Sequence, residues 1–191
     1  MVSAEAGSGR RPTEAGRDRA REGPAPPAMT RAPARARLIA LAVFAVAMGW
    51  LEAVVVVYIR ALTGLGHGAE VPEPAEVARR LGTVPWLIGT EQTRELATIV
   101  MLAAVAMVAA RAWRARLGAF LLCFGVWDIV YYMALFTLLR WPPGLATLDV
   151  LFLIPPSPLW YQPVWVPVAI SCGMIAAGAV LFARAEAGPP A

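Results

Sequence analysis

The chain has 191 residues, of which 59% are hydrophobic and 16% are charged, and its formal net charge is +4. A mean hydropathy of +0.60 and four long, nearly uncharged runs exclude a soluble globular protein, because such runs would expose apolar surface to water. Most of the excess positive charge lies in the first 37 residues without interleaved aromatic residues, so we expect no nucleic-acid partner. The sequence therefore predicts a polytopic membrane protein in contact with the lipid bilayer.

Residues 1–34 are rich in Ala, Arg, Pro, Gly and Glu and lack apolar periodicity, which is typical of a disordered cytoplasmic tail. Met29 precedes a more compact start, so the sequence leaves open whether Met1 or Met29 begins the protein. We expect a membrane domain over 35–185 and a short C-terminal tail over 186–191.

Four segments of this domain are predicted to be transmembrane helices. The first, 38–58, carries a single charge and would reach about 31 Å at 1.5 Å per residue, enough for a ~30 Å hydrocarbon core. The second is predicted over 90–110 with Thr90 as its N-cap, because its uncharged part alone is too short to span. The third and fourth are predicted over 117–139 and 163–182.

The placement of arginine predicts the orientation of the helices, because cytoplasmic loops are enriched in positive charge. The segments before the first helix, between the second and third, and after the fourth carry Arg31, Arg35, Arg37, Arg111, Arg114, Arg116 and Arg184. The opposite side carries a smaller set over longer sequence, Arg60, Arg79, Arg80, Arg94 and Arg140. Both termini are therefore expected in the cytoplasm (N-in, C-in), with the protein in the inner or plasma membrane of the cell.

Two loops on the outer side carry further signals. Residues 74–81 are expected to form a short helix, with Glu76 and Arg80 spaced for an i,i+4 ion pair. The segment 141–160 contains an apolar run, 150–154, that is bracketed by prolines and is too short to span. We expect it to be interfacial or re-entrant, because irregular backbone must be shielded from lipid. The predicted fold class is an all-α membrane four-helix bundle with this one short segment.

Acidic residues inside the apolar segments define a candidate polar site. Asp128 lies at the midpoint of the third helix, where a carboxylate costs roughly 2.5–3.5 kcal/mol on insertion scales and normally faces a protein interior or an aqueous cavity. Glu52 and Glu95 each lie roughly 8–9 Å below the outer boundary, and Asp149 would cover them if its loop folds inward. The candidate site comprises Glu52, Glu95, Asp128 and Asp149, with Arg94, Thr98 and Tyr132 as polar neighbours.

Each of these acids also has a purely structural interpretation, because a protonated carboxyl can simply hydrogen-bond a neighbouring helix. Trp127 is interpreted as a packing residue, and Tyr131 and Tyr132 are more often structural. The chain lacks the usual hydrolase, nucleotide-binding and redox motifs, and its one histidine cannot complete a usual zinc or haem site. No metal ligands are assigned and the cofactor is left open, although carboxylates suit hard cations such as Mg²⁺ and Ca²⁺.

Three segments, Gly125–Tyr132 (GVWDIVYY), Trp141–Pro143 and Asp149–Pro155 (DVLFLIP), resemble those of a family of small uncharacterised bacterial four-helix integral membrane proteins. The likeness covers the first helix through the start of the fourth, whereas the arginine-rich tail departs from the compact form of that family. The resemblance implies a bacterial membrane location and a common polar site around the four acids, and it implies no mechanism.

Three functions are compatible with these features. The leading hypothesis is an acidic intramembrane site near the outer leaflet that binds or conducts a small cation or a proton. One alternative is a noncatalytic accessory subunit that contacts a membrane protein partner through a packing motif at Gly173 and Ala177. The other is a membrane-embedded enzyme acting on a lipid or isoprenoid ligand, with one acid as general base and others holding a divalent metal.

Overall fold

The computed structural model describes residues 32–66, 68–69 and 73–187. Four of its helices are long and apolar enough to cross a membrane, so the protein is a mostly helical, multi-pass membrane protein. They are α2 (Ala34–Leu62), α4 (Leu87–Ala109), α5 (Trp113–Leu139) and α6 (Trp165–Glu186). Most of both predicted tails, and the alternative start at Met29, lie outside the described residues.

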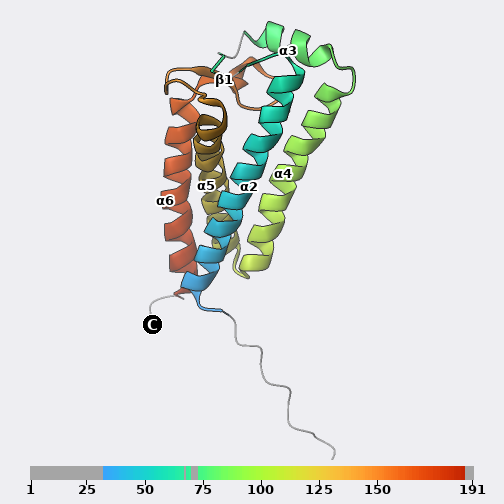
Figure 1. Cartoon of the computed structure of the whole chain (residues 1–191). Coiled ribbons are helices and arrows are strands. Elements are labelled where there is room, and N and C mark those ends of the chain that lie inside the picture. The colour runs from blue at the N-terminus through green and yellow to red at the C-terminus, as the bar shows by residue number, and fades with distance from the viewer. Residues whose placement is uncertain (1–31, 67, 70–72, 188–191) are drawn as a thin grey trace, which may run out of the picture. The chain divides into compact units, whose positions relative to one another are not determined.

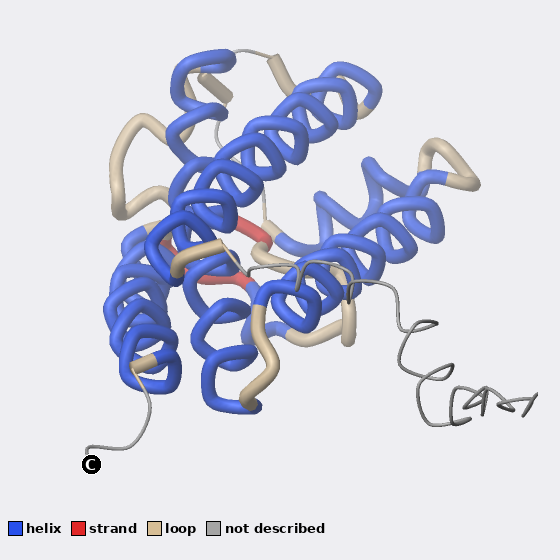
Figure 2. The backbone as a smooth tube through the Cα atoms, turned by 90° about the horizontal axis from the view of Figure 1, so that it is seen from below, coloured by secondary structure: helices blue, strands red, loops and turns tan. Residues whose placement is uncertain are grey.

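The four long helices lie side by side and alternate in direction (Figure 1). The first residues of α2 and the last of α6 share one end of the bundle, which we call the terminal end. The opposite end, which we call the loop end, carries the short helix α3 (Pro74–Gly82) and the connection between α5 and α6. Helix α5 packs most extensively on α6 and α2, whereas α4 rests mainly on α5. Figure 2 shows the same helices from below, with the two short strands in red.

The observed helix bounds differ from the predicted ones near arginine. Helix α2 begins four residues before 38 and α5 four residues before 117, because arginine is a good helix former whose long side chain reaches polar partners. The predicted N-cap at Thr90 is wrong. Helix α4 begins at Leu87, directly after the turn that follows α3, and the Thr90 hydroxyl donates to the Trp86 carbonyl at 2.8 Å within the first turn.

The segment between α5 and α6 contains a small antiparallel sheet that the all-α prediction omits. Strand β1 (Leu148–Val150) pairs with β2 (Tyr161–Pro163), and the 3-10 helix η1 (Pro158–Trp160) leads into β2. Pairing continues where the Leu151 N–H donates to the Trp160 carbonyl at 2.8 Å. The sheet satisfies backbone groups that the surrounding prolines exclude from a helix, and it folds the segment over the loop end of the bundle.

Close helix crossings depend on glycine. A Cβ added at Gly178 of α6 would lie 2.6 Å from the Leu122 nitrogen and 2.7 Å from the Gly118 carbonyl oxygen, both in the backbone of α5. A Cβ at Gly49 of α2 would lie 2.6 Å from the Trp127 carbonyl oxygen of α5. Small residues thus bring both neighbours of α5 into backbone contact, as is common between membrane helices. Gly173, half of the predicted packing motif, is exposed on the outside of the bundle.

The interior changes character along the bundle. Around the terminal end it is apolar, and its buried residues are Leu41, Ala45, Leu102, Ala106, Ala115, Ala119, Leu122 and Phe182. Within the described residues, the buried polar side chains lie from the middle of the bundle to the loop end; they are Glu52, Arg60, Glu91, Glu95, Thr98, Asp149 and Ser171. The fold therefore places its polar groups together in one part of an otherwise apolar bundle.

Candidate functional site

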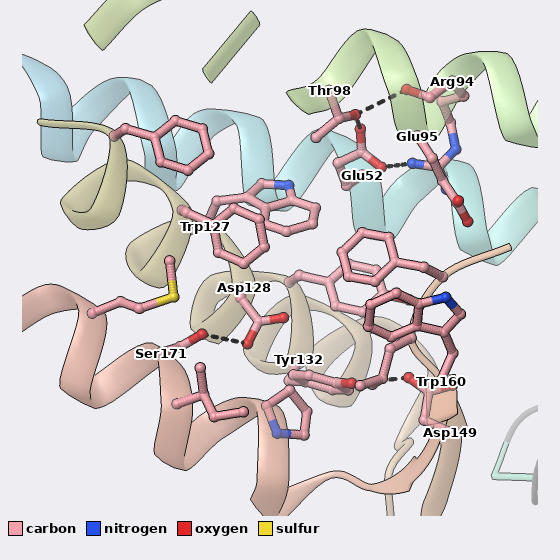
Figure 3. Close-up of a pocket in the computed structure, with 18 residues that line it drawn as sticks. Glu52, Arg94, Glu95, Thr98, Trp127, Asp128, Tyr132, Asp149, Trp160 and Ser171 are labelled. Carbon is pink, nitrogen blue, oxygen red and sulfur yellow. Dashed lines mark hydrogen bonds and ion pairs between the residues drawn. The ribbon is translucent and has the colours of Figure 1, made fainter. Parts of the chain in front are cut away.

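A cavity of about 330 Å³, which we call the central pocket, lies between α4 and α6, over one face of α5 and beneath the segment that follows β1 (Figure 3). Every residue of the candidate site lines it. These residues are Glu52 of α2, Arg94, Glu95 and Thr98 of α4, Asp128 and Tyr132 of α5, and Asp149 of β1. Side chains from three helices and one loop therefore converge although they lie up to 97 positions apart in the sequence.

Glu52 is the carboxylate with a complete set of partners. Arg94 forms an ion pair with it, and the Thr98 hydroxyl donates to its other oxygen (Figure 3). The Arg94 Nε also donates to Glu91 at 2.7 Å, one turn earlier on α4. One guanidinium thus balances two buried carboxylates, and the Glu52 pair ties α4 to α2 where the two helices otherwise touch little.

The Glu95 carboxylate accepts hydrogen bonds from the backbone of the segment after β1 and forms no ion pair within the described residues. Its two carboxylate oxygens accept from the Leu153 N–H at 3.0 and 2.9 Å, which fixes the segment after β1 against α4. The segment predicted to be interfacial or re-entrant contributes Leu151 and Phe152 to the lining of the pocket. Because Glu95 is only 7% exposed, its charge is held in a weakly solvated position.

Asp128 and Asp149 each accept a hydrogen bond from a neutral hydroxyl group. The Ser171 hydroxyl of α6 donates to Asp128 at 2.8 Å, and the Tyr132 hydroxyl donates to Asp149 at 2.9 Å. The Val150 N–H donates to the second Asp149 oxygen at 2.8 Å. Burial raises the pKa of Asp149, and the hydrogen bonds from Tyr132 and Val150 and the charge of Arg60 oppose this only in part. Asp149 thus lies inward from its loop and is in contact with α5.

The pocket carries an excess of acidic groups. Within the described ranges, Glu95, Asp128 and Asp149 have no ion-pair partner within 4.0 Å. The next arginine, Arg60, lines a smaller neighbouring cavity of about 140 Å³, where it lies 5.0 Å from the Trp141 ring centroid and donates to the Ala69 carbonyl. Such carboxyls can accept protons or bind a cation through oxygen. Among the described residues, no group of three or more His, Cys, Asp and Glu side chains is placed to hold a metal ion.

Several residues that line the pocket or contact its members were not predicted as part of the site. Ser171, the partner of Asp128, and Glu91, the second partner of Arg94, were missed, although a lone serine in an apolar helix and the i,i+3 spacing of Glu91 and Arg94 were available signals. An aromatic stripe with spacings of 4, 3 and 4 forms the floor of the pocket; its members are Phe120, Phe124, Trp127 and Tyr131. Trp127 does pack, at 5.2 Å from Phe124 between ring centroids, and it also lines the cavity.

The fold and the site together define a multi-pass helical membrane protein with a polar pocket lined by all four long helices and a covering loop. No protein-family model, curated protein or solved structure matches the chain. The functional argument therefore starts from the chemistry of the pocket.

The raised pKa of Asp149 predicts a pH-dependent stability. Because the folded protein holds this proton to higher pH than the unfolded chain, the contribution is fully present below the ordinary aspartate range and is lost as the pH rises through the raised pKa. We expect the free energy of unfolding to fall as the pH rises from the ordinary aspartate range through the raised pKa, and Asp149→Asn to flatten that slope. Unfolding in mixed micelles with sodium dodecyl sulfate at several pH values measures both.

Glu76→Gln is the matched control for this prediction. Hydrogen bonds from Arg79 and Arg80, at 2.6 and 2.7 Å, lower the pKa of exposed Glu76 to about 2. Glu76 is therefore ionised throughout the tested range, and its replacement should leave the slope unchanged. Equal slopes for wild type and Asp149→Asn would show that Asp149 does not titrate in the folded protein as its burial implies.

Proposed function

We propose that this protein binds a small cation or a proton in the central pocket, near the outer leaflet of a bacterial inner membrane. The observation that carries the proposal is that Glu95, Asp128 and Asp149 line one cavity and lack an ion-pair partner within the described part of the chain. Buried carboxyls are costly in a bilayer and are usually retained where they pair, relay protons or line a path. A cation entering the pocket would supply the missing charge.

The geometry favours binding over conduction. The polar groups stop near the middle of the bundle, and the terminal end is filled by an apolar core around Leu41, Leu102 and Phe182. A charge would face the cost of crossing that core without a polar partner. At the terminal end, Arg37 donates to the Ala109 carbonyl at 2.8 Å and pairs with Glu186, which fastens three helices together. We therefore propose a site that opens toward one side.

The same arrangement supports the N-in, C-in orientation as part of the proposal. Two of the arginines counted on the outer side, Arg60 and Arg94, lie within helices and point their charges at partners inside the bundle. Only Arg79, Arg80 and Arg140 remain on that side outside the long helices among the described residues. The terminal end carries Arg35, Arg37, Arg111, Arg114, Arg116 and Arg184, and from the positive-inside rule we propose that this end lies in the cytoplasm.

Asp128→Asn is the substitution that tests the proposal. Its one hydrogen-bond partner in the structure is the neutral Ser171 hydroxyl, so asparagine can keep the contact while the charge is removed. Purified protein in nanodiscs would be unfolded thermally with Na⁺, K⁺, Mg²⁺, Ca²⁺ and tetramethylammonium, and across pH. A bound cation at 100 times its Kd should stabilise wild type by about 2.7 kcal/mol, and Asp128→Asn should weaken that affinity roughly tenfold.

Glu76→Gln again serves as the control, because it removes one carboxylate from exposed α3 and should leave the cation response unchanged. The proposal fails if no cation and no pH change stabilises wild type. It also fails if Asp128→Asn responds as wild type does, because the pocket would then not be where the cation binds.

The two alternative functions stay predictions. The exposed face of α6 at Gly173 and Ala177 is accessible to a second membrane protein, which would suit an accessory subunit; stable co-purification with one larger partner is its test. The enzyme hypothesis would require metal-dependent turnover of a lipid extract.

A further inference from the structure

The central pocket is amphipathic along its length. Its floor on α5 runs from Tyr132 to Phe120, twelve residues or roughly 18 Å of helix. The polar groups gather toward the loop end, where Asp128 and Asp149 lie with Tyr132 (Figure 3). The remainder toward the terminal end is lined by Phe120, Phe124 and Met174. A bare metal ion or a proton would use the polar part and leave the apolar part without a role.

The pocket also reaches the lipid-facing surface of the bundle. Ile170 of α6 lines it and is 58% exposed, and α4 and α6 make little direct contact with each other. A ligand can therefore enter between these helices from the bilayer, without first crossing the covering loop. Lateral entry of this kind suits a molecule that already resides in the membrane.

Trp127 marks the boundary between the polar and the aromatic parts of the pocket. The Trp127 side chain lines the pocket and the residue is only 8% exposed, yet its Nε1–H has no hydrogen-bond partner among the described residues. Buried donors are normally satisfied, because leaving one unpaired is costly. The ring lies on the pocket floor one position before Asp128 in the sequence, where the polar part gives way to the aromatic part (Figure 3). The nitrogen itself is covered by protein rather than open to the cavity, so the ring offers a ligand its apolar surface.

We propose that the cation bound in the central pocket is the ammonium head group of a single-chain amphiphile drawn from the outer leaflet. Its ammonium lies against Asp128 and Asp149, and its chain follows Trp127, Phe124 and Phe120. The cavity volume of about 330 Å³ is at the low end for small-molecule sites, which favours one chain over two. This inference rests on the proposed function, since both require a cation among the same acids.

Electron paramagnetic resonance in phosphatidylcholine nanodiscs tests the inference. The probes are a long-chain trimethylammonium with a nitroxide near the chain end and the same labelled chain ending in a carboxylate. Wild type should immobilise the cationic probe roughly tenfold more strongly than the anionic one, as a charge-assisted contact implies. Asp128→Asn should abolish most of that preference.

Met174→Trp fills the apolar part of the pocket and leaves the acids in place. It should abolish retention of the cationic chain while the stabilisation by tetramethylammonium persists. Val180→Trp, at an exposed position on α6 outside the pocket, is the matched control and should change neither. If Met174→Trp fails to fold, Ile170→Trp at the exposed mouth tests the same blockage.

The outcomes separate this inference from the proposed function. Tetramethylammonium binding that depends on Asp128, without any preference for the cationic chain, would overturn the amphiphile and leave the cation site standing. A preference that survives both Asp128→Asn and Met174→Trp would be an ordinary boundary-lipid effect and would also overturn the inference. If neither tetramethylammonium nor the labelled chain binds, both proposals fail.

Discussion

Gly178→Ala is expected to lower the free energy of unfolding by about 3 kcal/mol, a large effect for one added methyl group. The new Cβ would lie 2.6 Å from the Leu122 nitrogen and 2.7 Å from the Gly118 carbonyl oxygen. Both are backbone atoms of α5, so no side chain can rotate away and the two helices must separate. Because α6 also presents Ser171 to Asp128, that separation should disturb the central pocket as well.

The chain offers a close control for this prediction. Gly173→Ala makes the same substitution five residues earlier on α6, where an added Cβ meets nothing within 4 Å. It should change the free energy of unfolding by no more than about 0.5 kcal/mol. Unfolding of each variant in mixed micelles with sodium dodecyl sulfate compares them directly. Equal effects would contradict the α5–α6 crossing, because the difference depends on the contact made by Gly178 alone.

The membrane-spanning helices could be predicted from the sequence because the bilayer sets a length and an apolarity that four segments satisfy. Their ends were less predictable. Arginine beside an apolar run looks like a boundary, yet Arg37 continues α2 because its side chain reaches the Ala109 carbonyl of α4. Thr90 has the chemistry of an N-cap, but the turn after α3 starts α4 three residues earlier. In both cases a partner elsewhere in the fold decided where the helix begins.

The members of the candidate site could be predicted by depth, since acids at similar heights in neighbouring helices tend to approach one another. Their individual partners could not. Hydrogen bonding of Asp128 to Ser171 depends on how α5 and α6 rotate about their axes, which the glycine crossing sets. Likewise, the contact of Glu95 with the Leu153 N–H depends on a loop that forms a small sheet rather than a helix. A single sequence does not determine how the helices rotate about their axes or which conformation the loop adopts.

Arg94→Met is expected to destabilise the protein by about 3–5 kcal/mol, the usual cost of removing one partner from a buried ion pair. Arg94 contacts both Glu52 and Glu91, and neither has another cation within 4.0 Å in the described ranges. Its loss therefore leaves two buried carboxylates without compensation. Replacing all three by Arg94→Met, Glu52→Gln and Glu91→Gln should restore most of the stability, because no unpaired charge is then left behind. A triple variant as unstable as Arg94→Met would show that Arg94 acts through packing instead.

The same residue distinguishes charge from shape in ligand binding. If the central pocket attracts a cation through its excess negative charge, Arg94→Met should raise the affinity for tetramethylammonium roughly tenfold, whereas Asp128→Asn lowers it. Combining Arg94→Met with Glu91→Gln restores the net charge and should return the affinity close to that of wild type. Lower affinity in Arg94→Met would mean that the guanidinium itself holds part of the ligand, and a cation could not then be the only group recognised. An electrostatic site for a cation requires that Arg94→Met raises the affinity and that Asp128→Asn lowers it. It also requires that Arg94→Met combined with Glu91→Gln leaves the affinity close to that of wild type.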